Sequence, residues 1–163
     1  MIQIQKFSLW AFSDFLPEIN DLYTELHQGK RKGSVTLENF LKTLDDKEFH
    51  LFVAVDVDSG RKKIVGMGTI FIKQKPEEWI GEIHDMAVIG PMQKQGIGGK
   101  IVDALLVCAK YHARYVKSEI ELSLTSNSSR TAAHKLYLKK GFRLVATSYG
   151  VDGTNLYKKT ITP

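Results

Sequence analysis

A strand-like segment that runs through a glycine-rich loop into a long amphipathic segment constrains this chain more than any other feature. The stretch is Val88 to Leu106, VIGPMQKQGIGGKIVDALL, and its loop carries Gly96, Gly98 and Gly99. Glycine lets the backbone approach an anion closely, and the first amide N–H groups of a helix have no intrahelical acceptor. The sequence therefore predicts a phosphate-binding corner, with Lys94 and Lys100 adding positive charge.

Other nucleotide-binding loops fit this stretch less well. A Walker loop needs serine or threonine after its Gly-Lys, and here Ile101 follows Lys100. The dinucleotide fingerprint needs its third glycine where Ile101 stands. Gln93-x-x-Gly96-x-Gly98 instead resembles the Q/R-x-x-G-x-G/A signature of the GNAT superfamily of N-acetyltransferases. A turn that merely caps the helix is the alternative interpretation of these glycines.

A second block, Leu124 to Phe142 (LTSNSSRTAAHKLYLKKGF), resembles the last conserved segment of the same superfamily. That segment combines a serine and an arginine with an alanine, a tyrosine and a final Gly-Phe. The resemblance is strongest from Glu82 to Phe142, and two blocks in the right order are more specific than either alone. One departure is Ser129, followed by Arg130, where many relatives carry asparagine.

Hydrophobic periodicity predicts both strands and helices along the chain. Strand patterns cover residues 2–7, 51–57, 64–72, 79–89, 119–125, 142–149 and 154–161, and helical patterns cover 15–26, 37–44, 97–109 and 132–140. The predicted helix N-caps are Ser13 or Asp14, Thr36 and the polar cluster 126–129, and Gly141 ends the last helix.

The expected fold class is α/β (α+β), with one domain over residues 1–163 and a mixed, twisted sheet of about seven strands flanked by about four helices. The resemblance implies a GNAT-like arrangement, in which the two central parallel strands, 82–89 and 119–125, splay apart at one end. No internal repeat or linker is visible in the sequence.

Composition narrows the function classes. The chain has 163 residues, 43% of them hydrophobic and 25% charged, which is typical of a globular domain. No apolar run approaches the ~20 residues of a membrane span, and the N-terminus lacks a signal-peptide pattern. The lone cysteine, Cys108, agrees with a reducing compartment, so we expect a cytoplasmic protein without a membrane partner.

Charge and histidine spacing exclude two further classes. The net charge is +5, but no run of basic residues interleaved with aromatics marks a nucleic-acid surface. We therefore expect no nucleic-acid partner. The five histidines show no metal-ligand spacing, so no metal is expected.

The resemblance implies acetyl-CoA as the co-substrate and assigns residues to it. Its pantetheine arm would hydrogen-bond the main chain around Met86, Ala87 and Val88, and its diphosphate would contact the amides of Gln95, Gly96, Ile97, Gly98 and Gly99. Gln93, Lys94 and Lys100 complete the first block, with Lys94, Lys100 or Lys135 near the outer phosphate. The second block contributes Asn127, Ser129, Arg130 and Ala133.

Acetyl transfer to an amine requires a general base. An amine with a pKa near 10.4 is mostly protonated at neutral pH, and exposing its lone pair costs about 4 to 5 kcal/mol. By resemblance, Glu82 matches the glutamate that serves as base in histone-modifying relatives, often through water. Alternation places His84 on the same face, with Met86 and Val88, and Asp85 on the opposite face. Glu82, His84 and a water chain all remain candidates.

A general acid must protonate the departing thiolate. Tyr137 occupies the position of the usual acid in the resembling block, one helical turn after Ala133, and simple core packing is its alternative role. Cys108 lies mid-helix among apolar residues, so a covalent acyl-enzyme is not expected. Direct attack in a ternary complex follows, with the thioester carbonyl polarised by a backbone N–H near Val88.

Two functions from different classes fit these features. The first is an acetyl-CoA-dependent N-acetyltransferase acting on a primary amine of a small molecule or peptide. The second is a non-catalytic module that senses acyl-CoA. Glu82 together with Tyr137 favours the enzyme, because a sensor needs neither. A homodimer through the terminal strands is common among relatives and is compatible with the sequence.

Overall fold

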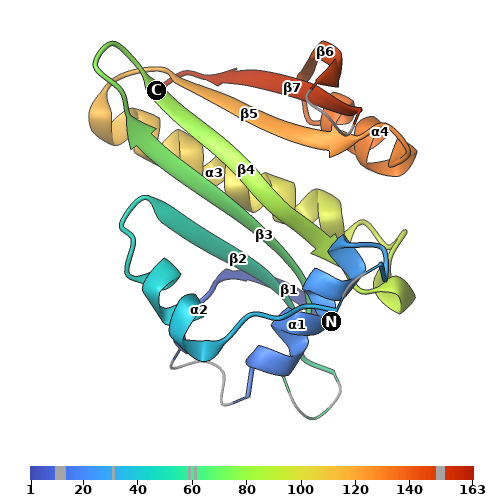
Figure 1. Cartoon of the computed structure of the whole chain (residues 1–163). Helices are drawn as coiled ribbons and strands as arrows, with labels where there is room; N and C mark the ends of the chain where they lie inside the picture. Colours follow the sequence, from blue (N-terminus) through green and yellow to red (C-terminus); the bar gives the residue numbers. More distant parts are fainter. Residues whose placement is uncertain (10–13, 31, 59, 61, 150–152) are drawn as a thin grey trace. The chain divides into compact units, whose positions relative to one another are not determined.

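A computed structural model describes residues 1–9, 14–30, 32–58, 60, 62–149 and 153–163 (Figure 1). Within these residues, seven strands form one mixed sheet in the order β1-β2-β3-β4-β5-β7-β6, accompanied by four α-helices. The expected fold class is therefore confirmed. The chain divides into two compact units, residues 1–70 with 85–105 and residues 71–84 with 106–163.

The first unit contains the N-terminal strands and helices. Its elements are β1 (Ile2–Lys6), α1 (Leu16–Leu26), α2 (Leu37–Leu44), β2 (Phe49–Asp56), the first part of β3 (Lys63–Gln74), the end of β4 (Trp79–Val88), a 3-10 turn (Gly90–Met92) and the start of α3 (Ile97–Val116). Apolar residues of α1, α2, β2 and β3 form its core, where the rings of Phe7, Phe15 and Phe40 contact one another.

The helix starts in this unit only partly follow the predictions. Thr36 caps α2 as expected, because its hydroxyl accepts a hydrogen bond from the Asn39 N–H. The N-cap of α1 is Phe15 without a side-chain cap, so the Asp14 prediction is wrong, and Ser13 lies outside the described residues. Pro17 in the first turn explains this start, since its fixed φ suits a helix beginning.

The apolar stripe predicted for α2 is only partly buried. Phe40 is buried, whereas Leu37 is half exposed and Leu41 is also exposed. A helix of eight residues has little more than two turns, so buried Phe40 and partly buried Leu44 pack against the core while the other two leucines face solvent.

Two glycines bring β3 close to α3. A Cβ atom at Gly68 would lie 2.6 Å from Met86 Sδ and 2.7 Å from Ile101 Cγ2, and one at Gly66 would lie 3.1 Å from Ile101 Cδ1. A side chain at either position would therefore require Met86 or Ile101 to shift. This contact, together with the buried Ile97, Ile101 and Leu105, fixes where α3 begins.

The second unit contains the C-terminal part of the sheet. Besides parts of β3, β4 and α3, its elements are β5 (Ile120–Asn127), α4 (Thr131–Lys139), β6 (Arg143–Tyr149) and β7 (Thr154–Ile161). The predicted parallel pairing of β4 with β5 is confirmed, and its ladder runs from Trp79↔Ile120 to Ile83↔Leu124. Gly141 ends α4 with a φ of 80°, the left-handed conformation predicted for it.

The terminal hairpin inserts its second strand into the sheet. β7 pairs antiparallel with β5 from Ile120↔Ile161 to Asn127↔Thr154, and β6 pairs with β7 at the edge. The β5 to β7 ladder thus continues past Leu124, where the β4 to β5 ladder ends. In the part of the chain that the structure describes, no helix is long and apolar enough to cross a membrane.

Candidate active site

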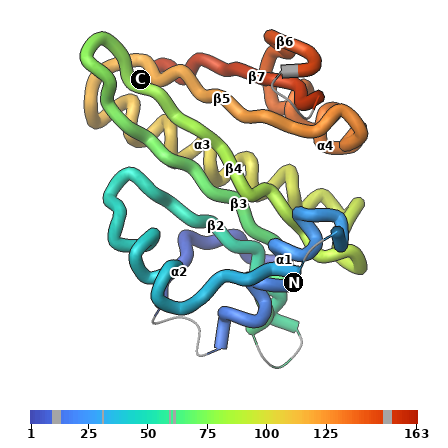
Figure 2. Tube along the Cα trace, in the orientation of Figure 1, coloured from blue at the N-terminus to red at the C-terminus, as the bar shows by residue number. Residues whose placement is uncertain are grey.

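The glycine corner, residues 93–99, belongs to the first unit and joins the end of β4 to the start of α3. Figure 2 shows the path of the chain between these two elements. Lys94 and Gly96 have φ angles of 61° and 78°, so the backbone adopts the left-handed conformation twice before α3 begins at Ile97. Ile97 is buried and anchors the loop, while Lys94, Gln95, Gly96 and Lys100 are exposed. Lys100 N–H is bonded to the Gly96 carbonyl at 3.1 Å. The earlier helix amides have no intrahelical acceptor, which suits an anion such as a diphosphate.

The side chain of Gln93 makes contacts that the sequence did not reveal. Its Nε2 donates to Glu25 Oε1 on α1 at 2.8 Å and to the Val88 carbonyl at 2.9 Å. Gln93 therefore holds the loop between α1 and the end of β4. Glu25 is a neighbour of the corner that no sequence motif indicated, because it lies 68 positions away.

The end of β4 departs from a regular strand at Asp85. This residue has a φ of 53°, and its Oδ2 accepts hydrogen bonds from Tyr23 Oη at 3.1 Å and Thr69 Oγ1 at 3.2 Å. A left-handed residue interrupts the alternation of side chains between the two faces. The prediction that Asp85 faces away from Glu82 and His84 assumes a regular strand. The left-handed conformation of Asp85 contradicts that assumption, so the facing of its side chain stays a prediction.

The residues after Asp85 alternate regularly. Met86 lies against Gly68 on the side of α3, whereas Ala87 packs into the core shared with α1. The Val88 carbonyl accepts the hydrogen bond from Gln93 Nε2. Burial beside the Asp85 carboxylate raises the pKa of the Tyr23 phenol well above its usual value, so Tyr23 stays a hydrogen-bond donor at neutral pH.

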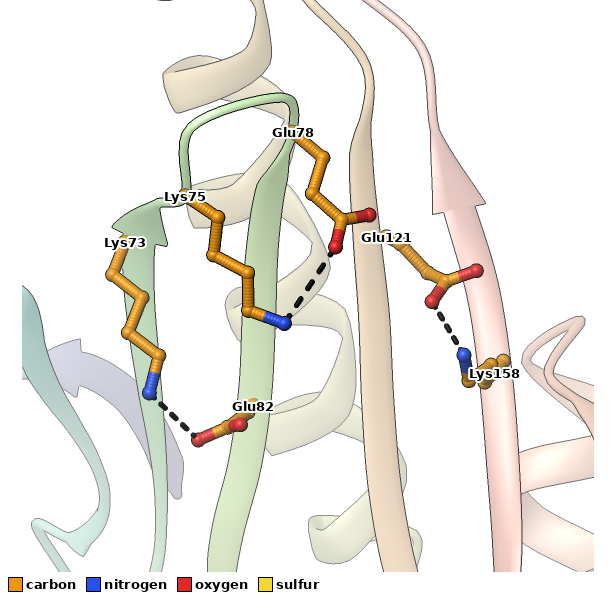
Figure 3. Close-up of polar contacts among 6 residues, drawn as sticks. All are labelled: Lys73, Lys75, Glu78, Glu82, Glu121 and Lys158. Atoms are coloured by element: carbon orange, nitrogen blue, oxygen red, sulfur yellow. Dashed lines mark hydrogen bonds and ion pairs between the residues drawn. The ribbon is translucent and has the colours of Figure 1, made fainter.

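Glu82 lies in the second unit with two possible cationic partners. Lys73 Nζ on β3 is 3.4 Å from Glu82 Oε2, as Figure 3 shows, and His84 Nε2 is 3.8 Å from the same oxygen. The His84 ring also meets the Phe71 ring edge-on at a centroid distance of 6.0 Å. The structure thus brings together the two predicted base candidates. The sequence did not indicate Lys73.

Tyr137 is buried on α4 among aromatic rings. Its ring centroid is 6.2 Å from that of Phe142 and 5.7 Å from that of Tyr157. Burial raises the pKa of Tyr137 to about 12, although the charge of Arg130 opposes the shift. The phenol therefore remains protonated at neutral pH, as an acid or hydrogen-bond donor must. Packing and acid function are both compatible with this position, so its role stays a prediction.

The polar cluster before α4 folds differently from the prediction. Asn127 Oδ1 accepts from Ser129 N–H at 3.0 Å and Ser129 Oγ at 2.7 Å, which closes a local turn. The N-cap of α4 is Arg130, without a side-chain cap bond, so capping by the cluster is wrong. His134 Nε2 instead contacts the Asn127 carbonyl at 2.9 Å, an interaction the sequence did not reveal. Arg130 and Ala133 are half-buried.

Among the described residues, no group of three or more histidine, cysteine, aspartate or glutamate side chains is arranged to hold a metal ion. Cys108 lies inside α3 and is partly buried.

The comparisons with known proteins decide the family. Residues 47–144 match the family model described as acetyltransferase (GNAT) domain. The chain belongs to the GNAT acetyltransferase family. This GNAT N-acetyltransferase is 31% identical, over 124 residues, to the aminoalkylphosphonate N-acetyltransferase of Salmonella typhimurium, an alignment that covers 75% of each chain. The resemblance seen in the two sequence blocks is thereby confirmed.

Solved structures extend the likeness to the whole fold. A GNAT-family acetyltransferase from Streptococcus pneumoniae gives a TM-score of 0.71 at 17% identity, covering 99% of both chains. Arabidopsis thaliana NAA60 in complex with acetyl-CoA gives 0.70 at 15% identity, again covering 99% of both chains. At such low identity these neighbours show the GNAT fold alone.

Proposed function

We propose that this GNAT enzyme transfers an acetyl group from acetyl-CoA to a primary amine of a small molecule or peptide, by direct attack in a ternary complex. The observation that carries the proposal is the glycine corner, where left-handed Lys94 and Gly96 precede a helix that begins at buried Ile97 and whose first amides have no intrahelical acceptor. A diphosphate suits this corner because its negative charge matches both the free amides and the lysines.

In the proposed reaction each residue has a separate task. Acetyl-CoA supplies the acetyl thioester. Gln95 to Gly99 hold the diphosphate through backbone N–H groups, with Lys94 and Lys100 adding positive charge. The main chain of Met86 to Val88 contacts the pantetheine arm, and an N–H near Val88 polarises the carbonyl. Asn127, Ser129, Arg130 and Ala133 line the coenzyme from the second block.

Proton transfers complete the chemistry. Glu82 or His84 takes the proton of the acceptor amine, directly or through water, as the nitrogen bonds to the acetyl carbon. The carbon–sulfur bond breaks with its electron pair on sulfur, and Tyr137 donates a proton to that sulfur. The products are an N-acetyl amine and the free thiol of CoA.

The name of the Salmonella relative supports a small-molecule amine as the acceptor. We propose further that one N-acetyltransferase domain spans residues 1–163 and acts in the cytoplasm. Its partners would be the coenzyme and the amine, with no nucleic acid and no membrane.

Release of the CoA thiol provides the test. Purified protein is mixed with acetyl-CoA and each of a panel of polyamines, amino acids, aminoglycosides, aminoalkylphosphonates and peptides. We expect thiol release above the acceptor-free rate with at least one class. Mass spectrometry should find the acetyl group on nitrogen.

A rise in melting temperature with acetyl-CoA, without turnover of any acceptor, would instead support the non-catalytic acyl-CoA sensor. Absence of both effects would contradict the coenzyme assignment itself.

A further inference from the structure

Lys73 and Glu82 form an ion pair across the turn that joins β3 to β4. Lys73 Nζ is 3.4 Å from Glu82 Oε2, and the two side chains are 39% and 37% exposed. Both residues lie in the second unit, on neighbouring strands of the sheet. Figure 3 shows the two side chains extending toward each other from their strands. The proposed mechanism uses the glutamate and leaves the lysine without a task.

An ion pair with this exposure can exchange partners easily. Solvent-exposed pairs contribute little net stability, because water solvates both charges when they separate. An acceptor ammonium that reaches Glu82 therefore competes with Lys73 at small cost. Lys73 would then carry an ammonium beside the ammonium of the acceptor, which is unfavourable unless an anion joins them.

Two other lysines of this region pair with carboxylates other than Glu82. Lys158 on β7 is bonded to Glu121 at 2.5 Å, and Lys75 pairs with Glu78 at 3.6 Å (Figure 3). The strand register places Ser123 beside Glu82 and Lys158 beside Ser123, so Lys158 is the next lysine along the sheet in that direction. Of the three lysines drawn, Lys73 is the one whose partner the proposed reaction recruits.

We infer that the acceptor carries an anionic group close to its primary amine, and that Lys73 binds this anion while Glu82 engages the amine. Carboxylate, phosphonate and sulfonate share the required chemistry, since each accepts several charge-assisted hydrogen bonds. The 3.4 Å separation between Lys73 Nζ and Glu82 Oε2 favours a short spacer between the two charges of the acceptor. Lys73 is thus a specificity-determining residue. The inference rests on the proposed acetyl transfer.

Matched acceptors with and without the anion provide the test. The rate of thiol release from acetyl-CoA is measured with β-alanine and β-alaninamide, and with 2-aminoethylphosphonate and its dimethyl ester. The wild-type protein should prefer the anionic member in kcat/KM by about 10- to 100-fold, the usual range for a hydrogen bond to a charged group. Most of the preference should lie in KM, because the anion is bound equally before and during the reaction.

Three variants assign the preference to a residue. Lys73→Met should reduce the ratio to about one, because it removes the partner of the anion; the ratio within each variant is the readout, since the change also removes the cation beside Glu82 and so alters the rates with both acceptors. Lys73→Arg retains the charge and should keep most of the ratio. Lys158→Met removes the other lysine of the same sheet region and should leave the ratio unchanged. Melting curves confirm that each variant is folded.

The failures are distinguishable. Absence of thiol release with every acceptor overturns the proposed function and this inference with it. Turnover of amines with no preference for the anionic members overturns the inference alone. It is also overturned if Lys73→Met keeps the ratio, or if Lys158→Met rather than Lys73→Met abolishes it.

Discussion

The glycine corner of the first unit and the Glu82 and Tyr137 positions of the second unit are built by different means. The corner consists of backbone, since its proposed ligands are amides and its shape depends on left-handed Lys94 and Gly96. The second unit relies on side chains, and Glu82 and Tyr137 depend on ion pairing and burial respectively. Most amino-acid substitutions leave the backbone N–H and C=O groups in place, whereas a single substitution removes a functional side chain.

This difference predicts which measurement each region controls. Substitutions at the corner should act through backbone torsion and should change coenzyme affinity. Substitutions at Glu82 or Tyr137 should act through protonation and should change turnover.

Tyr137→Phe should have the largest effect. We expect kcat to fall by about 100-fold or more, since a general acid typically contributes that much, while acetyl-CoA affinity stays nearly constant. Tyr157→Phe is the matched control, because it removes a second buried phenol whose ring lies 5.7 Å away. Steady-state kinetics and calorimetric titration measure the two quantities. Equal kcat values for Tyr137→Phe and wild type would remove Tyr137 from the mechanism.

Alkaline stability should report the burial of Tyr137. Its pKa is raised from 10.0 to about 12, so the folded state keeps the proton that the unfolded state loses above pH 10. The stabilisation is complete below pH 10 and is lost as pH rises toward 12. Relative to Tyr137→Phe, the wild type should lose about 2 to 3 kcal/mol of unfolding free energy over this interval. Urea unfolding at successive pH values measures it, and parallel curves for the two proteins would contradict the burial.

Gly96→Ala should have an intermediate effect. Alanine is strained at a φ of 78° by about 1 to 2 kcal/mol, and relief of that strain would turn the amides away. We expect acetyl-CoA affinity to fall by about 10-fold. Gly29→Ala is the control, since Gly29 has a φ of 71° and, like Gly96, open space around the added methyl. It should lose similar stability without changing affinity, and equal affinity losses would show that the corner has no special role.

Gln93→Ala should have the smallest effect. Loss of its bonds to Glu25 and Val88 should lower the unfolding free energy by about 1 kcal/mol and weaken acetyl-CoA binding by about threefold. Glu25→Ala should reproduce most of this loss, whereas Glu25→Gln keeps an acceptor oxygen and should not. A full effect of Gln93→Ala with none from Glu25→Ala would dismiss the link to α1.

The fold could be predicted largely because its signals are local. Alternating apolar residues gave the strands, and Thr36 and Gly141 marked a helix start and a helix end correctly. The wrong predictions concern helix N-caps, where several neighbouring residues could each take the capping position. Phe15 replaces Asp14 at the start of α1, and Asn127 bonds Ser129 instead of capping α4.

The site was less predictable because its contacts are distant in sequence. The residues of the glycine corner are consecutive in the sequence, so their motif could be recognised from the sequence. The contact of Lys73 with Glu82 depends on strand register, and that of Gln93 with Glu25 spans 68 positions. The left-handed φ of Asp85 could not be predicted from the alternation of apolar residues, because alternation assumes a regular strand.

Gly68 and Gly96 limit natural variation of the first unit for opposite reasons. Gly96 faces open space, so its tolerance is set by torsion, and asparagine is the natural replacement there. Gly68 lies close to the side chains of Met86 and Ile101, so its tolerance is set by volume, and an added methyl group would require those side chains to shift. In a library of single substitutions, we therefore expect the residues accepted at position 68 to be limited by side-chain volume and those accepted at position 96 to be limited by their ability to adopt a positive φ.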